Sequence, residues 1–171
     1  GMHMERPDRF RQRIRSALLW AVVFSWMAFI YSFSAQDGEQ SASLSGGLIR
    51  ACLSLFHPGF DHLPAEEMAA LVDSWQFFVR KAAHFSVYLV LGVFAALAAD
   101  SHPLPHPGKW LLPAGICLLY AGLDEWHQSF VPGRSPQLRD VGIDFAGAAV
   151  GIVPAMGVLV LVKRRAASAK A

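Results

Sequence analysis

The densest set of side chains capable of chemistry in this sequence lies between residues 124 and 144. It combines carboxylates, an imidazole, an amide and guanidiniums: Asp124, Glu125, His127, Gln128, Arg134, Arg139, Asp140 and Asp144. Such groups can transfer protons, bind an anion or neutralise one another. The flanking stretches 110–123 and 145–162 carry no charged residue. An ionisable cluster between two apolar stretches is costly unless its members are paired or used.

The composition indicates a membrane protein. Of the 171 residues, 54% are hydrophobic and 16% are charged, which is too apolar for an ordinary soluble domain of this size. We predict one all-α membrane domain over 17–162, with a basic collar over 1–16 and a basic tail over 163–171. The net charge of +2 comes from local arginine clusters, so no nucleic-acid partner is expected. Cys52 and Cys117 lie in unlike settings and are expected to be free thiols.

The first predicted membrane span follows the basic collar. The segment 17–33 has no charged residue and contains several aromatic side chains. A basic start before an apolar run is also typical of a cleaved signal peptide, and the small residues Ser32 and Ser34 leave that alternative open. Because the run is long and further apolar segments follow it, we favour an uncleaved transmembrane helix.

Two helices are expected in and after the connection over 37–76. The first would lie on the membrane surface, because apolar side chains follow helical spacing at Leu44, Leu48, Cys52 and Leu55. The second begins after Pro64 and continues as the second span over 82–99. Prolines then predict a non-helical turn over 100–109.

The third and fourth spans are predicted from Trp110 and over 141–162. The charge-free part of the third helix would be only about 21 Å long at 1.5 Å per residue, whereas a bilayer core is about 30 Å thick. The third helix must therefore carry Asp124 and the following residues into the membrane. By the same argument, the second span includes Lys81 and His84. These ionisable groups are thus expected in the outer part of the membrane.

The predicted topology places the cluster on the outer side of a cell membrane. Four spans return both termini to one side. Ten of the 15 lysines and arginines lie in the collar, in the turn between the second and third spans, and in the tail. Basic residues are enriched on the cytoplasmic side, so both termini are expected in the cytoplasm.

The four predicted spans each present a polar stripe at this depth. The stripes are Ser34 and Gln36; Lys81, His84 and Tyr88; Tyr120, Asp124, His127 and Gln128; and Asp140 and Asp144, continued by Gly147 and Gly151. Glu125 points about 100° away from Asp124 at 3.6 residues per turn. The two glycines predict a close helix contact. We therefore predict a buried pocket with twelve ligand-binding residues: Ser34, Gln36, Lys81, His84, Asp124, Glu125, His127, Gln128, Arg134, Arg139, Asp140 and Asp144.

Three interpretations of this cluster remain open. In a purely structural network, the cations Lys81, Arg134 and Arg139 pair with the acids Asp124, Asp140 and Asp144. Zinc or manganese would suit imidazole and carboxylate ligands from His84, Asp124, His127 and Asp144, but the neighbouring cations oppose a metal ion, and we predict none. Arg134 and Arg139 instead suit a bidentate phosphate or carboxylate ligand.

Several motifs in the chain resemble the VanZ-like family of small membrane proteins. They are the Ser34–Gln36 segment; Lys81, His84, Phe85 and Tyr88; Asp124, Glu125, His127, Gln128, Phe130, Pro132, Gly133 and Arg134; and Asp140, Asp144 and Gly147. The chain departs from the family at Asp144, where asparagine is more common. The resemblance implies an integral membrane protein of the cell envelope. The founding member is linked to low-level resistance to the glycopeptide antibiotic teicoplanin, but the resemblance supplies no agreed reaction or cofactor.

Two functions are favoured by these residues. The first is a non-enzymatic pocket for an anionic membrane lipid or a lipid-linked cell-wall precursor. The alternative is a hydrolase or transferase acting on lipid phosphates, with His127 as general base, Asp124 as its orienting partner and Arg134 as the phosphate clamp. A transporter is disfavoured because the inner halves of the spans lack charges. Small residues on the helix faces would also allow a homo-oligomer.

Overall fold

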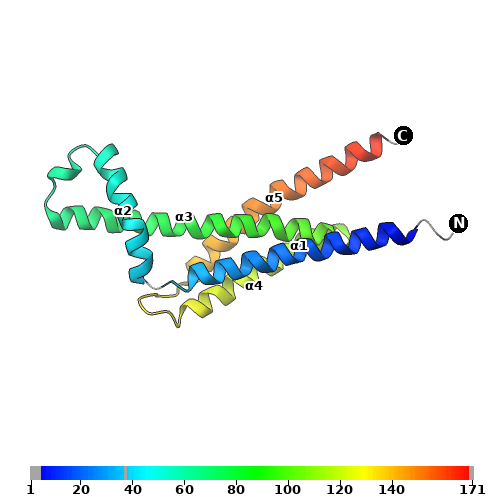
Figure 1. Ribbon diagram of the computed structural model, residues 1–171, viewed down its shortest axis with the longest axis horizontal. Helices are drawn as coiled ribbons and strands as arrows, with labels where there is room; N and C mark the ends of the chain where they lie inside the picture. The colour runs from blue at the N-terminus through cyan, green and yellow to red at the C-terminus, as the bar shows by residue number, and fades with distance from the viewer. Residues whose placement is uncertain (1–4, 37, 170–171) are drawn as a thin grey trace.

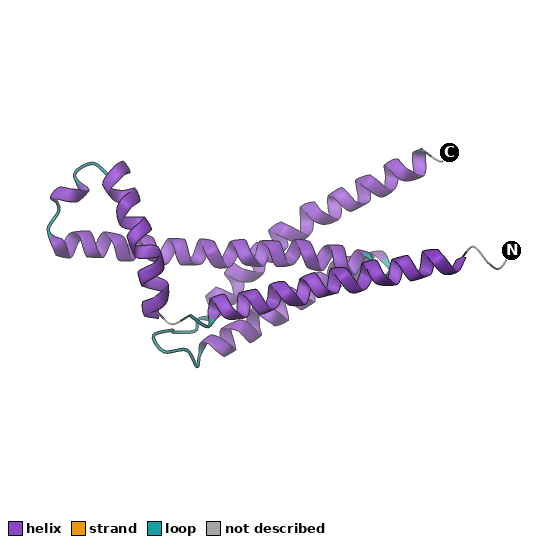
Figure 2. Cartoon of the chain, in the orientation of Figure 1, coloured by secondary structure: helices purple, strands orange, loops and turns teal. Residues whose placement is uncertain are grey.

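The computed structural model describes residues 5–36 and 38–169 of the chain. These residues form five α-helices and one short 3₁₀ helix (Figures 1 and 2). The helices are α1 (Glu5–Ser34), α2 (Gly38–Phe56), η1 (Phe60–His62), α3 (Ala65–Asp100), α4 (His106–Gln128) and α5 (Leu138–Ser168). The prediction of an all-α protein is confirmed for the described residues. The predicted collar and tail fall partly outside them.

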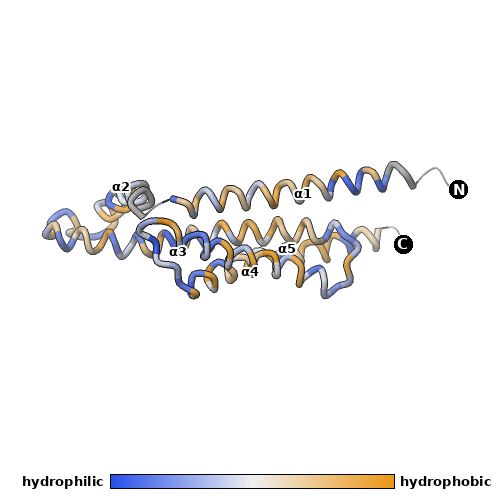
Figure 3. The backbone as a smooth tube through the Cα atoms, turned by 90° about the horizontal axis from the view of Figure 1, so that it is seen from below, coloured by the Kyte–Doolittle hydropathy of each residue, from blue (hydrophilic) through white to orange (hydrophobic). Residues whose placement is uncertain are grey.

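Four helices run along the length of the molecule, and one crosses them. Figure 1 shows α1, α3, α4 and α5 extended along the long axis, with the start of α1 and the finish of α5 at the same end. At the opposite end, α2 crosses the first part of α3 at a steep angle. In Figure 3 the hydrophilic segments lie mainly toward the two ends of the long axis.

Three of the helices are long and apolar enough to cross a membrane. They are α1 from Asp8, α3 and α5. The fourth long helix, α4, does not meet the same criterion within the described residues, because polar residues lie at both of its ends, with His106 and Lys109 at the start and the ionisable cluster in the C-terminal turns. Membrane character is therefore supported, whereas the predicted count of four spans is not confirmed.

The helices α3 and α5 approach each other closely through glycine, as the spacing of Gly147 and Gly151 predicted. A Cβ atom added to Gly147 would lie 2.3 Å from the carbonyl oxygen of Phe85, and one added to Gly151 would lie 2.0 Å from that of Leu89. Gly92 of α3 faces the backbone of Ala148 in the same way. Any side chain at these positions would separate the helices, so glycine sets the distance between α3 and α5.

A second, smaller core joins α2 and η1 to the start of α3. It contains Ile49, Leu53, Phe60 and Val72. The helix expected in the first connection is thus confirmed. Of the predicted stripe, Leu48, Cys52 and Leu55 are exposed, and the side chain of Leu44 lies outside the described part. A position of α2 on a membrane surface stays a prediction.

Three boundaries differ from expectation. The turn over 100–109 was predicted to be non-helical, but α4 already begins at His106. Pro107 is tolerated there because the first turn of a helix needs no backbone N–H donor. The basic collar belongs to α1, and α5 continues past Lys163, since charged residues end an apolar stretch without ending a helix. Both cysteines are free, as predicted.

Candidate functional site

The Asp124 carboxylate joins three helices at the end of the bundle away from the termini. Ser34, at the end of α1, donates a hydrogen bond to Asp124 Oδ2 over 2.9 Å. The Tyr88 hydroxyl of α3 donates to the same oxygen over 3.2 Å. All three side chains are buried. The predicted polar stripes of these helices therefore meet.

A second buried carboxylate lies beside this group. Asp144 of α5 is 1% exposed and His84 of α3 is 7% exposed. The distance between His84 Nδ1 and Asp144 Oδ1 is 3.4 Å, which exceeds the usual range of about 2.7–3.2 Å for an N–H···O hydrogen bond. Asp144 Oδ1 has no hydrogen-bond partner among the described residues. The two side chains thus contact each other without satisfying the carboxylate.

Cations surround these acids from two sides. Lys81 of α3 forms an ion pair with Asp140 in the first turn of α5. Arg134, in the loop between α4 and α5, donates from Nε and Nη2 to the backbone oxygen of Gln36 over 3.3 and 3.1 Å. The predicted residues of the first helix end therefore reach the site through the Ser34 hydroxyl and the Gln36 carbonyl.

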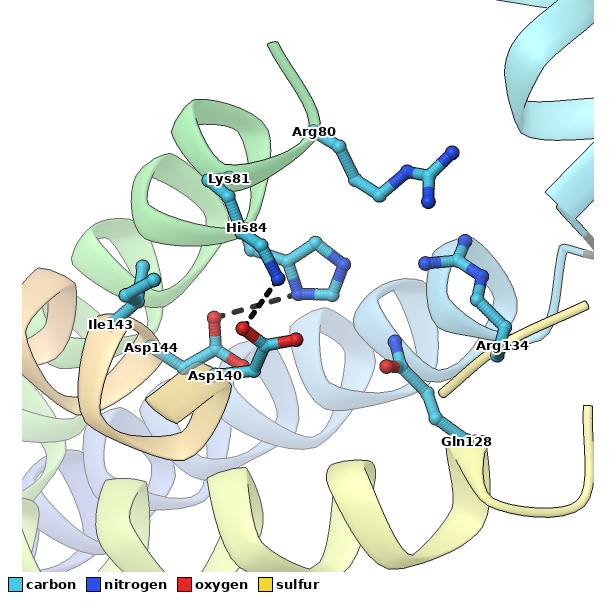
Figure 4. Close-up of a pocket in the computed structure, with 8 residues that line it drawn as sticks. All are labelled: Arg80, Lys81, His84, Gln128, Arg134, Asp140, Ile143 and Asp144. Atoms are coloured by element: carbon cyan, nitrogen blue, oxygen red, sulfur yellow. Dashed lines mark hydrogen bonds and ion pairs between the residues drawn. The ribbon is translucent and has the colours of Figure 1, made fainter. Parts of the chain in front are cut away.

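A small cavity of about 20 Å³ lies within this arrangement. It is lined by Arg80, Lys81, His84, Gln128, Arg134, Asp140, Ile143 and Asp144. Figure 4 shows the guanidinium groups of Arg80 and Arg134 pointing toward each other, with Asp140 and Asp144 on the opposite wall. A cavity of this size holds about one water molecule. A larger ligand would have to displace side chains.

The match to a family model identifies the chain. The VanZ/LLP1 family model matches residues 19–162, which include the end of α1 and all of the site just described. This chain belongs to the VanZ/LLP1 family. The resemblance found in its motifs is therefore confirmed. No curated protein and no solved structure matches the chain.

One charged residue that lines the cavity of this VanZ/LLP1 protein was not predicted from the sequence. Arg80 precedes Lys81 on α3 and lies off the predicted stripe, but its long side chain reaches the cavity. Its Nε is buried and has no hydrogen-bond partner among the described residues. Two neighbouring cations before His84 were the available signal, although helical periodicity alone would place only Lys81 on the face of His84.

Two predicted ligand-binding residues serve other contacts. The guanidinium carbon of Arg139 lies 5.6 Å from the centroid of the Phe77 ring, and Arg139 is exposed and does not line the cavity. Glu125 is buried, and its Oε1 accepts a hydrogen bond of 2.6 Å from the backbone N–H of Gln137, just before α5. A carboxylate there satisfies a free donor at a helix N-terminus.

The other residues of the polar stripe predicted on α4 contact different parts of the structure. Gln128 lines the cavity, whereas the Tyr120 hydroxyl donates to the backbone oxygen of Met27 over 2.5 Å. The His127 ring lies 4.3 Å from that of Tyr31, centroid to centroid. His127 Nδ1 is buried without a hydrogen-bond partner among the described residues. Hence His127 and Asp124 contact different neighbours.

The position of Arg134 in the loop destabilises the positive charge of its side chain. Its partial burial lowers the pKa of the guanidinium below its ordinary value, and the nearby positive charge of Arg80 lowers this pKa further. An arginine side chain nevertheless stays protonated in proteins. Two positive charges therefore face the same small cavity.

Proposed function

We propose that this VanZ/LLP1 protein is a four-span protein of the cell membrane that binds the phosphate group of an anionic lipid or of a lipid-linked cell-wall precursor. The observation that carries the proposal is the pair of guanidinium groups, Arg80 and Arg134, that face the same cavity. Arginine side chains bind phosphate through paired N–H donors, more specifically than lysine does.

Neither of these arginines is neutralised by an acid in the described part of the chain. The ion pairs of the site are Lys81 with Asp140 and His84 with Asp144. Arg134 instead donates to a carbonyl oxygen, and Arg80 Nε has no partner there. Two partly buried like charges are unfavourable side by side unless an anion lies between them. A bound phosphate would supply that anion.

The small volume of the cavity defines how a phosphate would enter. About 20 Å³ accommodates about one water molecule, so the phosphate would have to move the arginine side chains outward. Both arginines are only half-buried, and both are long side chains with many rotamers. Binding would therefore reorganise Arg80 and Arg134 while α3, α4 and α5 stay in place.

Four observations support the membrane arrangement. At 1.5 Å per residue, the 23 residues of α4 extend about 34 Å, enough for a hydrocarbon core of about 30 Å. Helix α4 runs beside α3 and α5. The start of α1 and the finish of α5 lie at one end (Figure 1), as an even number of crossings requires. The excess of basic residues near that end favours the cytoplasm, with the arginine cavity outside.

The geometry favours binding over the predicted hydrolase. A His127–Asp124 dyad would need the Asp124 carboxylate to orient the imidazole, but the hydrogen bonds to Asp124 come from Ser34 and Tyr88. The purely structural alternative accounts for the Lys81–Asp140 pair. It leaves Arg80, whose Nε has no hydrogen-bond partner among the described residues, unexplained.

Native mass spectrometry of the detergent-purified protein tests the proposal. We expect a retained phospholipid or polyprenyl phosphate that is lost in Arg80→Gln and in Arg134→Gln. The matched control is Arg139→Gln, because Arg139 is exposed and does not line the cavity. Equal lipid retention in all three variants would contradict the proposal. If the retained lipid is a cell-wall precursor, deletion of the protein should also change teicoplanin susceptibility.

A further inference from the structure

Three buried side chains from three helices converge at the inner side of the arginine cavity. They are His84 of α3, Asp124 of α4 and Asp144 of α5. Each offers one imidazole nitrogen or carboxylate oxygen, and these three atoms all lie within 4.8 Å of one another. Residues this far apart in sequence meet only because the glycines of α3 and α5 allow a close helix contact.

The contacts within the protein do not satisfy this group. The one imidazole of the group, on His84, forms an ion pair only with Asp144, so it serves at most one of the two carboxylates. Asp144 Oδ1 is buried and aimed at His84 (Figure 4), yet it has no hydrogen-bond partner among the described residues. A buried carboxylate without adequate partners is costly. This unsatisfied oxygen is a second observation, independent of the clustering, that points to a missing positive ligand.

Of the two cations that argued against a metal in the sequence, Lys81 is neutralised by another acid, whereas Arg134 keeps its charge. Lys81 is paired with Asp140, and Arg134 donates to the Gln36 carbonyl. Among the described residues, Asp124 forms no ion pair, and Asp144 forms one only with His84. These two buried carboxylates therefore leave room for further positive charge.

We propose that His84, Asp124 and Asp144 bind a divalent metal ion of the Zn²⁺ or Mn²⁺ type. Imidazole and carboxylate together suit these ions, whereas Mg²⁺ prefers oxygen ligands and bound water. Around a tetrahedral ion with metal–ligand distances of about 2.0–2.2 Å, two ligand atoms lie about 3.3–3.6 Å apart. The observed limit of 4.8 Å thus requires each side chain to shift by less than about 1 Å.

The surroundings of the three side chains suit such a site. Ser34 and Tyr88 both donate to Asp124 Oδ2 and so fix the orientation of the carboxylate, as hydrogen bonds to ligating groups do in metal centres. Three protein ligands leave a coordination position open. His84 and Asp144 also line the cavity, which holds about one water molecule. The open position would therefore face the cavity and the two arginines.

Metal uptake by the full-length protein tests this assignment. The protein is purified in detergent without a metal-chelating tag, equilibrated with Zn²⁺, Mn²⁺ or Mg²⁺, and its metal content is measured by plasma mass spectrometry. We expect one Zn²⁺ or Mn²⁺ ion per chain, with less than a tenth of that content in Asp144→Asn and in His84→Gln. Ser34→Ala and Tyr88→Phe should weaken binding by roughly 10–100-fold.

Matched controls and a second readout keep the test decisive if a variant folds poorly. Asp73→Asn and His62→Gln change exposed residues of the same types and should retain the metal. EDTA should lower the thermal unfolding temperature of the wild type, and added Zn²⁺ or Mn²⁺ should restore it, whereas Asp144→Asn should respond to neither. Absence of uptake by the folded wild type, uptake of Mg²⁺ alone, or full uptake by Asp144→Asn would each overturn the assignment.

The metal site does not depend on the proposed anion binding. Arg80→Gln and Arg134→Gln should lose the lipid but keep the metal ion. If these variants lost the metal ion and kept the lipid, two conclusions would follow. The metal assignment would be wrong, and the lipid would bind at a site other than the arginine cavity.

Discussion

Charged side chains have different kinds of partner at the two ends of the molecule. At the end near the termini, Asp100 accepts from two lysines, Lys109 and Lys163. Nearby, His102 Nε2 accepts a hydrogen bond of 2.8 Å from the Trp20 indole. One acid thus has two cations that also reach water, which is the arrangement of a structural contact.

The opposite end has the same kinds of residue in a different balance. Its acids Asp124 and Asp144 are buried, and Asp144 has an oxygen without a hydrogen-bond partner in the described part of the chain. Its arginines Arg80 and Arg134 form no ion pair there. Apart from the Lys81–Asp140 and His84–Asp144 pairs, its positive and negative groups form no ion pair among the described residues. The comparison supports the proposal that the first cluster completes the fold and that the second cluster, which we call the ligand end, binds ligands.

The largest difference should appear when one acid is removed from each end. Asp124→Ala leaves the buried hydroxyls of Ser34 and Tyr88 without their acceptor, which should lower the free energy of unfolding by about 2–4 kcal/mol. Asp100→Ala removes the acid that two lysines contact, but these lysine side chains can turn to water. The free energy of unfolding should therefore fall by less than about 1 kcal/mol. Thermal unfolding in one detergent, with EDTA present to exclude metal effects, measures both. Equal shifts in the unfolding temperature would remove the distinction between the two ends.

A smaller effect should show whether the ligand end depends on the close contact of α3 and α5. Gly147→Ala places a methyl group 2.3 Å from the Phe85 carbonyl oxygen, one turn beyond Asp144. Overpacking of this kind costs about 1–3 kcal/mol, and it should move His84 away from Asp144 and weaken metal and lipid binding.

The matched control for that change lies on the same helix. Gly157 has no atom within 4 Å of an added Cβ, so Gly157→Ala should leave binding unchanged and stabilise the helix by up to about 1 kcal/mol. Thermal unfolding and metal content measured on both variants give the comparison. Normal metal binding in Gly147→Ala would show that the ligand end tolerates a wider helix spacing.

Helical periodicity predicted several, but not all, of the side chains that meet at the ligand end. Lys81, His84 and Tyr88 lie one helical turn or two apart, and a polar stripe in an apolar helix has to face its neighbours. The Gly147 and Gly151 contact followed from the same rule, because small residues allow helices to approach. These predictions depend on local geometry alone.

The pairing of the charges could not be predicted in the same way. Whether Lys81 pairs with Asp140 or with Asp124 depends on the rotation and axial position of α5 relative to α3, which the sequence of either helix does not determine. The role of Glu125 depends on the path of the loop to Gln137, and that of Arg80 on the reach of a flexible side chain. The partners of charged groups depend on the tertiary structure, even where the polar stripes that carry these groups follow from the geometry of a single helix.

The smallest expected effect separates the ion pairs of the two ends. Double-mutant cycles should give a coupling energy of about 1–2 kcal/mol for Lys81→Met with Asp140→Asn, since this pair is partly buried. For Lys163→Met with Asp100→Asn the coupling should be below about 0.5 kcal/mol, because the Lys163 side chain is 54% exposed. Raising the salt concentration should reduce the second coupling and leave the first almost unchanged, because exposed charges are screened. If both couplings fell equally with salt, the Lys81–Asp140 pair would be as accessible to ions as the pair near the termini, and the ligand end would then be open to water before any ligand enters.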